Sequence, residues 1–208
     1  MILIRELALR HRTVLRAALL LTAIFLLPSA FSKTVQWEEE VPLNTGETIW
    51  VKRSVKYKIQ GDAGNPLDLA LRPVRDETIE LVWKGKTYRY TGDARILLLA
   101  ISPGQIPTLV AKAPDNSWEA MHHYQCTIPY YVQLVPDTTG QIWNWPPKIE
   151  EWLFNLQTNL LLARHPPERM KQRYAAAEVQ QENRPGSARF PAEQKIDPTY
   201  TGDLCRKK

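Results

Sequence analysis

The sequence predicts a mainly β protein: an antiparallel meander, sandwich or partial barrel, followed by one or two C-terminal helices (α+β). Two observations carry this prediction. Short runs rich in β-branched and aromatic residues recur at even spacing between residues 33 and 145. Turns that contain Gly or Pro separate these runs, and no long helical pattern lies between them until after Pro146-Pro147. Strands connected in this way imply antiparallel pairing.

The N-terminal residues have the pattern of a secretory signal peptide. The apolar stretch Ala17–Leu27 follows a basic region and precedes small residues, which predicts cleavage after Ser32. A retained membrane anchor is the alternative, although the uncharged run is shorter than the roughly 20 residues of a spanning helix and contains Pro28. We therefore expect residues 1–32 to be a signal peptide or an anchor. The protein would then be periplasmic or secreted, or held in the inner membrane by its N-terminus.

Export changes the bulk properties of the remaining chain. Residues 1–32 contain four Arg and one Glu, so their removal lowers the formal net charge from +5 to +2. The basic character is therefore partly that of the signal, and we expect no nucleic-acid partner. The remainder is long enough for one domain. We divide it into a β-rich domain at residues 33–165, which ends in a capping helix, and a weak helix with a disordered tail at residues 166–208.

The first two strands are predicted at Trp37–Leu43 and Thr48–Ile59, around a turn at Asn44–Gly46. The second strand alternates, with apolar residues and Arg53 on one face. The other face carries a row of polar residues, Lys52, Ser54, Lys56 and Lys58. This row is interpreted as a solvated sheet face or a guarded edge. Contact with an anionic partner, such as lipid head groups or a polyanion, is the alternative.

The next strands lead to the predicted centre of the core. A short strand is predicted at Pro66–Leu71 and should end at Pro73. Proline has no amide hydrogen to donate to a neighbouring strand, so it is not expected inside a central strand. A hairpin is expected around Lys84–Lys86. Ile96–Ile101 is apolar on both faces, which predicts a strand covered on both sides. Ser102-Pro103-Gly104 suits a type II turn with a positive φ at Gly104.

The remaining elements complete the predicted domain. Thr108–Ala113 is expected to be a strand, and the last hairpin should join Tyr130–Val135 to Gln141–Trp145. An apolar stripe between Ile149 and Leu160 then predicts a capping helix. A weaker stripe predicts a second helix within Glu168–Gln181. The stretch from Arg184 onward holds Pro, Gly and charged residues, which is typical of a mobile tail.

The two cysteines have several possible states. In an oxidising compartment Cys126 and Cys205 could form a disulfide, which would constrain the unfolded chain by roughly 4 kcal/mol in the entropic model. Two unpaired thiols, or a mixed disulfide with a partner, remain open as alternatives. Cys126 with a nearby histidine could also act as a catalytic nucleophile if it were reduced.

Metal and cofactor sites are not expected. His122-His123 with Cys126 is the nearest approach to a metal cluster, but zinc needs three or four convergent ligands. Outside this cluster the mature chain has only His165 and Cys205 as further His or Cys ligands. The sequence contains neither a phosphate-binding loop nor a dinucleotide fingerprint. We therefore predict neither a catalytic residue nor a metal site nor a cofactor.

Three aromatic residues are the candidate ligand-binding site. Trp143 and Trp145 lie two apart on a predicted strand, so their indoles should share a face. With Tyr131 on the paired strand they could form an aromatic platform for a sugar ring or a peptide. Packing into the core is the alternative role for all three.

One part of the chain resembles a known family. The chain resembles a family of small, uncharacterised exported proteins of Gram-negative bacteria. The resemblance lies in Tyr124–Val132, in a short hairpin that ends in Trp143, and in Asn159–Leu161. The resemblance covers residues 36–162. It implies an exported β-rich domain, but no activity and no functional residue.

These observations favour an exported or periplasmic, non-enzymatic β-rich protein that binds an unknown protein or glycan partner. Contact with a membrane would occur only through an uncleaved N-terminal segment. One alternative is a small periplasmic hydrolase or redox enzyme that uses Cys126 and a histidine. Another is an accessory subunit of an envelope complex, anchored in the inner membrane.

Overall fold

The computed structural model describes residues 32–61, 64–65, 68–112, 128–162, 165–184 and 193–201. They form two β-sheets and one short α-helix, which confirms the predicted fold class. The chain divides into two compact units: the end of the β2–β3 hairpin, residues 57–72, belongs to the smaller one. Residues 34–56 and the chain from Pro73 onward form the larger one.

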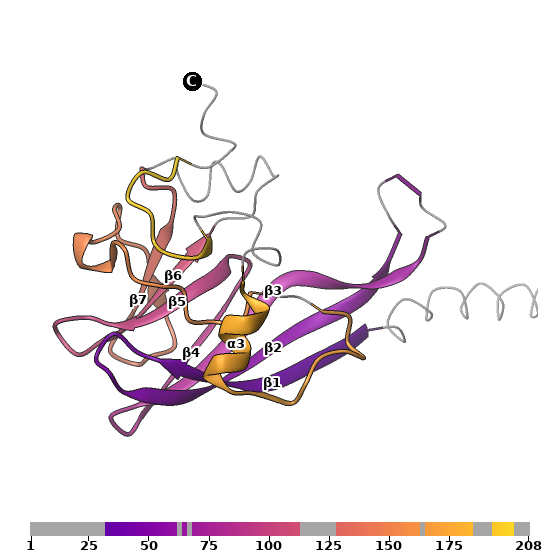
Figure 1. Cartoon of the computed structure of the whole chain (residues 1–208), viewed down its shortest axis with the longest axis horizontal. Helices are drawn as coiled ribbons and strands as arrows, with labels where there is room; N and C mark the ends of the chain where they lie inside the picture. The colour runs from indigo at the N-terminus through magenta and orange to yellow at the C-terminus, as the bar shows by residue number, and fades with distance from the viewer. Residues whose placement is uncertain are drawn as a thin grey trace, which may run out of the picture. The chain divides into compact units, whose positions relative to one another are not determined.

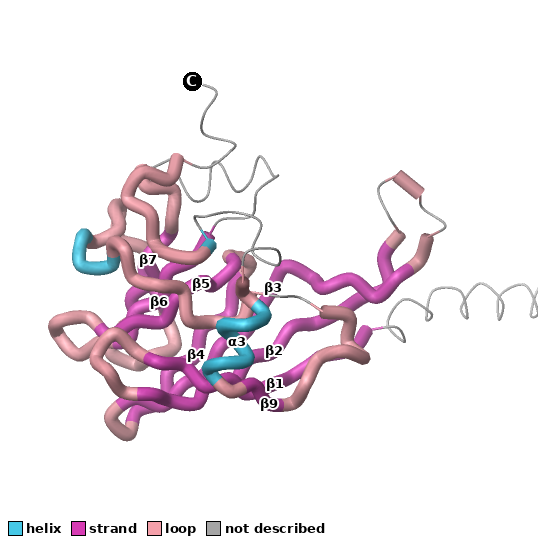
Figure 2. The backbone as a smooth tube through the Cα atoms, in the orientation of Figure 1, coloured by secondary structure: helices cyan, strands magenta, loops and turns pink. Residues whose placement is uncertain are grey.

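The first sheet has the strand order β4-β3-β2-β1-β9 (Figures 1 and 2). Its bounds are Ser32–Pro42 for β1, Thr48–Gln60 for β2, Ala70–Trp83 for β3, Lys86–Gly92 for β4 and Arg173–Tyr174 for β9. The first four strands follow each other in sequence and in the sheet, as expected for a meander. The short β9 differs because it pairs parallel to β1, with Glu38 opposite Arg173.

The predicted turns join these strands. Gly46 has a φ of +87° in the turn between β1 and β2. The β3–β4 turn has positive φ at both central residues, +48° at Lys84 and +76° at Gly85, which suits the right-handed twist of the paired strands. The pairing of β3 with β4 runs from Glu77 opposite Gly92 to Trp83 opposite Lys86.

Pro73 does not end a strand, contrary to the prediction. Of the predicted strand Pro66–Leu71, only Ala70 and Leu71 are in a strand, and they continue through Pro73 as β3; Pro66 and Leu67 lie outside the described residues. The part of β3 that pairs with β4 begins at Glu77, so Pro73 lies beyond the end of β4. Proline is tolerated at the margin of a sheet, because a residue there does not need to donate its amide hydrogen to a neighbouring strand.

The second sheet has the order β5-β6-β7-β8, with antiparallel neighbours. Its bounds are Arg95–Ile101 for β5, Pro107–Lys112 for β6, Val132–Pro136 for β7 and Trp143–Asn144 for β8. The predicted last hairpin is confirmed, with a φ of +79° at Gly140. In the β5–β6 turn the positive φ lies at Gln105, +64°, and not at Gly104 as expected.

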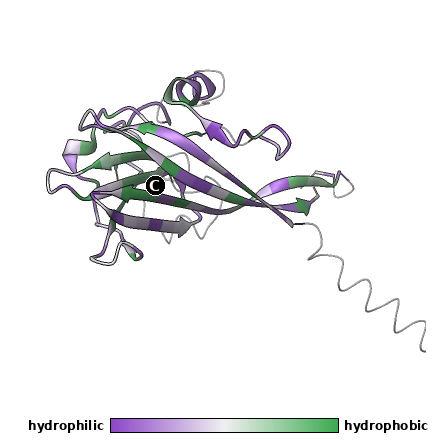
Figure 3. Cartoon of the chain, turned by 90° about the horizontal axis from the view of Figure 1, so that it is seen from below, coloured by the Kyte–Doolittle hydropathy of each residue, from purple (hydrophilic) through white to green (hydrophobic). Residues whose placement is uncertain are grey.

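The core lies between the two sheets, and a second apolar cluster covers the far face of the second sheet. Val41, Ile79 and Leu99 belong to the first cluster. Leu98 and Val110 belong to the second, together with Ile149 and Leu153. All residues from Ile96 to Ile101 are buried, which confirms that β5 is covered on both faces. Apolar and polar residues alternate along the strands of the first sheet (Figure 3).

The predicted capping helix between Ile149 and Leu160 is wrong. Only a 3₁₀ turn, Glu151–Leu153, forms there (Figure 2). Asn155 has a φ of +63°, which no helix continues. The chain then runs without helix, and the four consecutive residues Asn159–Leu162 are all buried. Leu160 packs between the sheets, whereas Leu162 packs in the cluster on the far face of the second sheet. A helix would bury one stripe only, whereas here four consecutive residues are buried and Leu160 and Leu162 contact different clusters, which does not fit a helix.

The C-terminal part also differs from expectation. The second predicted helix is shorter and begins later, as α3 at Ala176–Glu182. Residues 193–201 pack against the second sheet, with Ile196 fully buried. These residues correct the expectation of a tail that is mobile throughout. No helix within the described ranges is long and apolar enough to cross a bilayer, and residues 1–31 lie outside those ranges.

Candidate functional site

The structure does not bring the three predicted aromatic residues together. Trp143 packs edge-on against Tyr90, with ring centroids 5.9 Å apart, and its Nε1 donates to the Arg89 carbonyl at 2.7 Å. It contacts the core between the sheets. Tyr131 is buried in the cluster on the far face of the second sheet. Because Trp143 and Tyr131 contact different clusters, the predicted platform does not form, and Trp145 is 43 % exposed beyond the end of β8.

The cysteine and histidine candidates are only partly covered by the structure. Cys126, Cys205 and the His122-His123 pair lie outside the described residues, so the predicted disulfide and nucleophile stay predictions. His165 is described, and its Nε2 lies 3.1 Å from Glu182 Oε2. Within the described ranges, no group of three or more His, Cys, Asp or Glu side chains is placed to hold a metal ion.

A hollow of about 560 Å³ crosses the outer face of the first sheet. Outward side chains of four neighbouring strands line it: Glu38 from β1, Lys52 and Ser54 from β2, Thr78 and Glu80 from β3, and Arg89 from β4. These positions alternate with the buried ones on the same strands, so strand geometry alone aims them away from the core. Gln172, next to β9, closes one side.

One side of this hollow is organised by Arg173. Its Nε donates to Glu38 Oε2 at 3.1 Å, and its Nη2 donates to the same oxygen at 2.5 Å. These hydrogen bonds lower the pKa of Glu38, which therefore stays ionised at neutral pH. The guanidinium also lies over the indole of Trp50, 4.6 Å from the ring centroid. Trp50 is 45 % exposed, so its ring supports Arg173 from the surface of the sheet.

The rest of the hollow carries both signs of charge. Arg89 lies directly opposite Glu80 in the β3–β4 ladder, an arrangement that favours opposite charges. Lys52 makes no hydrogen bond or ion pair with any residue that the structure describes, and its side chain is exposed. A ligand at this face would therefore meet an available ammonium group between two regions that contain carboxylates.

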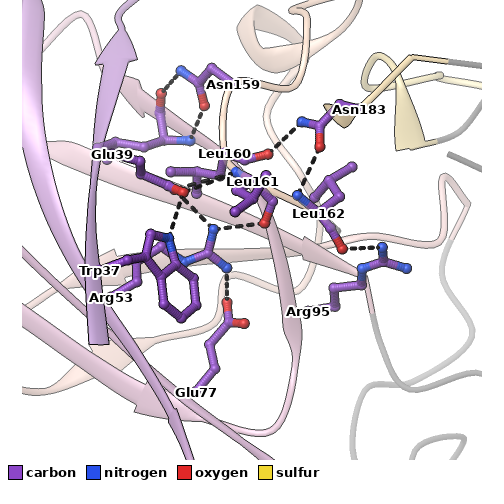
Figure 4. A network of polar contacts seen from close by, with 11 residues as sticks. Trp37, Glu39, Arg53, Glu77, Arg95, Asn159, Leu160, Leu161, Leu162 and Asn183 are labelled. Atoms are coloured by element: carbon purple, nitrogen blue, oxygen red, sulfur yellow. Dashed lines mark hydrogen bonds and ion pairs between the residues drawn. The ribbon is translucent and has the colours of Figure 1, made fainter. Parts of the chain in front are cut away.

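The opposite side of the same strands holds a buried ion-pair network (Figure 4). Arg53 donates from Nη1 to Glu39 Oε1 at 2.9 Å and from Nη2 to Glu77 Oε1 at 2.8 Å. The side chains of these three residues are at most 3 % exposed. Trp37 Nε1 donates to the second oxygen of Glu39 at 3.0 Å. The network ties β1, β2 and β3 together beneath the hollow.

The same network holds the extended segment Asn159–Leu162. Arg53 Nη1 donates to the Leu161 carbonyl at 2.9 Å, and the Leu161 amide donates to Glu39 at 3.3 Å. The side chain of Asn183 bonds the Leu160 carbonyl and the Leu162 amide (Figure 4). Backbone groups of an extended segment that has no full strand partner are thus satisfied by side chains.

Sequence reasoning found only part of this site. The alternation of β2 placed Lys52 and Ser54 on the outer face, which the structure confirms. On β1, neighbouring residues of the run Glu38–Glu40 face opposite sides by strand geometry, so Glu39 is buried while Glu38 faces the hollow. The contribution of Arg173 was missed. Arg173 reaches Glu38 because β9 pairs parallel to β1. A strand of two residues leaves no recognisable pattern in the sequence.

Comparisons of the chain with models of protein families, with curated proteins and with solved structures found no match. The resemblance to exported proteins of Gram-negative bacteria therefore stays a prediction.

Proposed function

We propose that this protein is an exported, periplasmic interaction protein that binds a partner protein through the outer face of its first sheet. The observation that carries the proposal is the polar hollow over β1–β4, lined by Glu38, Lys52, Glu80 and Arg89. The signal-like N-terminal sequence supports the compartment.

The chemistry of the hollow favours a macromolecular partner. Small-molecule sites are usually concave, mostly apolar and enclosed enough to bury most of the ligand. This hollow lies on a sheet face, and side chains of both charges, such as Glu80 and Arg89, line it. Such a surface is suited to a partner with complementary charges, because charge complementarity sets orientation and association rate.

The site is also preorganised. Its side chains project from hydrogen-bonded strands, and the ion pairs of Arg53 hold three of those strands together from the other side. Arg173 is held by Glu38 and by the face of Trp50. A surface that is fixed before binding loses less conformational entropy when the partner arrives.

Site-specific crosslinking tests the proposal. A photo-crosslinking amino acid at Ser54, inside the hollow, should capture one defined protein from the cell envelope. The same group at Lys84, in the exposed β3–β4 turn, is the matched control and should capture little. The double change Lys52→Glu and Arg89→Glu should abolish capture from Ser54 without unfolding the protein, which circular dichroism checks. Equal capture from both positions, or capture that survives the charge reversal, contradicts the proposal.

Export is tested separately by the intact mass of the protein recovered from its native compartment. We expect a periplasmic protein that lacks about 32 N-terminal residues, the length of the predicted signal. Recovery of the full-length chain from the cytosol contradicts the proposed compartment.

A further inference from the structure

The C-terminal strap, residues 193–201, lies on the second sheet in the manner of a bound peptide. Its backbone adds to the segment 155–158 like a short extra strand, with Lys195 opposite Gln157 in an antiparallel bridge. The Asn155 amide donates to the Ile196 carbonyl at 2.8 Å, and the Ile196 amide donates to the Leu156 carbonyl at 2.9 Å. Addition of a strand to an exposed edge is a common way of binding extended peptides.

Two side chains of the strap enter pockets. Ile196 is fully buried among apolar residues that include Leu97 and Val110. Glu193 is 2 % exposed, and its Oε1 lies 2.9 Å from Arg95 Nη1 and 3.5 Å from Lys112 Nζ. The strap thus presents a carboxylate and, three residues later, an aliphatic side chain to matching sites.

The far end of the strap is held by tyrosines. The ring of Tyr200 lies 5.1 Å from that of Tyr131, and the Tyr130 amide donates to the Tyr200 carbonyl at 2.6 Å. The hydroxyl of Tyr131 accepts from the Asp197 amide at 3.2 Å and donates to the Lys195 carbonyl at 3.4 Å. We use the name strap groove for the surface formed by segment 155–158 with Arg95, Lys112 and Tyr131.

The connection between the strap and the rest of the chain allows its exchange. Eight residues, 185–192, separate Arg184 from Glu193, and such a length spans up to about 30 Å when fully extended. The strap can therefore leave the groove while α3 and β9 stay in place. Its departure would take the Glu193 carboxylate away from the buried Lys112, so a replacement ligand that supplies a carboxylate is favoured.

We propose that the strap groove is a peptide-binding site and that the strap is its intramolecular occupant. The ligand is an extended segment of a partner protein with a carboxylate followed three residues later by an aliphatic side chain. The strap competes with this ligand and so lowers the ligand's apparent affinity for the groove. The groove uses the second sheet, so this proposal does not depend on partner binding at the hollow of the first sheet.

A cut-and-exchange experiment on the full chain tests this. A protease recognition sequence is placed within residues 186–191, and the folded protein is cleaved there. A fluorescent peptide with the sequence of residues 193–201 is then added in excess over the released fragment, and its binding is followed by anisotropy. We expect saturable binding to the cleaved protein. Binding to the uncleaved protein should be about 100-fold weaker or more, because a tethered competitor has a high effective concentration.

Peptide variants define the recognition without altering the protein. The Glu193→Gln peptide should bind about 30-fold more weakly, since it leaves the buried Lys112 and the partly exposed Arg95 without a carboxylate. The Lys195→Ala peptide is the matched control, because this side chain is exposed and its Nζ makes only a long, solvent-exposed hydrogen bond of 3.5 Å to Asn155 Oδ1; it should bind within about twofold of the original. Equal binding of the Glu193→Gln peptide would overturn the proposed specificity. Loss of the folded state on cleavage, or a folded cleaved protein that binds no peptide, would overturn the site itself.

Discussion

Arg53 shows how a single charged residue can organise the first sheet. Burial lowers the pKa of its guanidinium, but the nearby carboxylates of Glu39 and Glu77 more than offset this, and the net pKa is raised. Arg53 therefore stays charged inside the protein. Its partners come from β1 and β3 and from the carbonyl of Leu161, so one side chain joins three strands to the segment that crosses beneath them.

We predict that Arg53→Met lowers the free energy of unfolding by about 3–5 kcal/mol, because it leaves two buried carboxylates without their cation. The matched control is Lys52→Met, one residue earlier on the exposed face, which should change stability by at most about 0.5 kcal/mol. Urea unfolding followed by circular dichroism measures both variants. Similar midpoints for the two would contradict a stabilising role for the buried network.

Asp137 gives the turn before β8 a pH-dependent stability. Hydrogen bonds from the Thr139 hydroxyl and from the amides of Ile142, Gly140 and Thr139 lower the pKa of its carboxyl below the ordinary value of 3.8. A lowered folded-state pKa contributes stability above the unfolded-state pKa, and this contribution is lost as the pH falls through the folded-state value.

We therefore expect Asp137→Asn to be less stable than the original protein at pH 7. The difference should stay constant down to about pH 5 and shrink at lower pH, because protonation then removes the charge from the original protein as well. Urea midpoints of both proteins between pH 7 and pH 3 measure this. A difference that is the same at pH 7 and pH 3 argues against a role for the charge.

At the scale of elements, the extended segment Asn159–Leu162 is held largely by side chains in place of a full strand partner. Asn159 Oδ1 accepts from the Leu99 amide at 2.9 Å, and Asn159 Nδ2 donates to the carbonyls of Leu99 and Pro42, both at 2.8 Å. Asn44 bonds the backbone of Ile101 in the same way, at 2.7 and 2.9 Å. Two asparagines thus satisfy the backbone of β5 along this edge.

We predict that Asn159→Ala lowers the free energy of unfolding by about 3 kcal/mol, since it leaves several buried backbone groups without a side-chain partner. Gln157→Ala is the matched control, because the Gln157 side chain is exposed and its antiparallel bridge uses the backbone. It should change stability by at most about 0.5 kcal/mol. Equal effects in thermal or urea unfolding would contradict the role given to the Asn159 amide.

At the scale of the molecule, stability should differ strongly between β5 and the end of the β2–β3 hairpin. Every residue of β5 from Ile96 to Ile101 is buried. In the hairpin end, Ile59 is 40 % exposed and Leu69 is 66 % exposed. Elements with few buried apolar contacts open locally at a lower free energy than the core does.

We therefore expect hydrogen exchange to be slowest in the amides of β5 and β6 and much faster at residues 58–61 and 68–72. Exchange followed by mass spectrometry after proteolysis resolves these peptides. The turn at Lys84–Gly85 serves as a fast-exchanging reference within the larger unit. Protection of the hairpin end equal to that of β5 would contradict the burial pattern.

The differences between prediction and structure have local causes. The β-hairpins were predicted because their turn residues and the alternation of their strands act between near neighbours, as at Lys84-Gly85. The helix predicted up to Leu160 does not form, because the same apolar residues also suit an extended segment that packs in both apolar clusters. The spacing of apolar residues cannot distinguish a helix from such an extended segment. The side chains that bond the backbone of the segment, such as Glu39 and Asn183, lie elsewhere in the sequence.

The amino-acid sequence by itself determined the β-rich class, most of the hairpins and the doubly covered β5, because these depend on alternation and turn chemistry within short stretches. It also provided the basis for the proposed export. Only the tertiary structure decided that Tyr131 and Trp143 contact different clusters, that Arg173 reaches Glu38, and that residues 193–201 lie on the second sheet. These contacts join residues far apart in the sequence, as Arg173 and Glu38 are at a separation of 135 positions, or depend on which face a strand buries. No local pattern encodes such pairings.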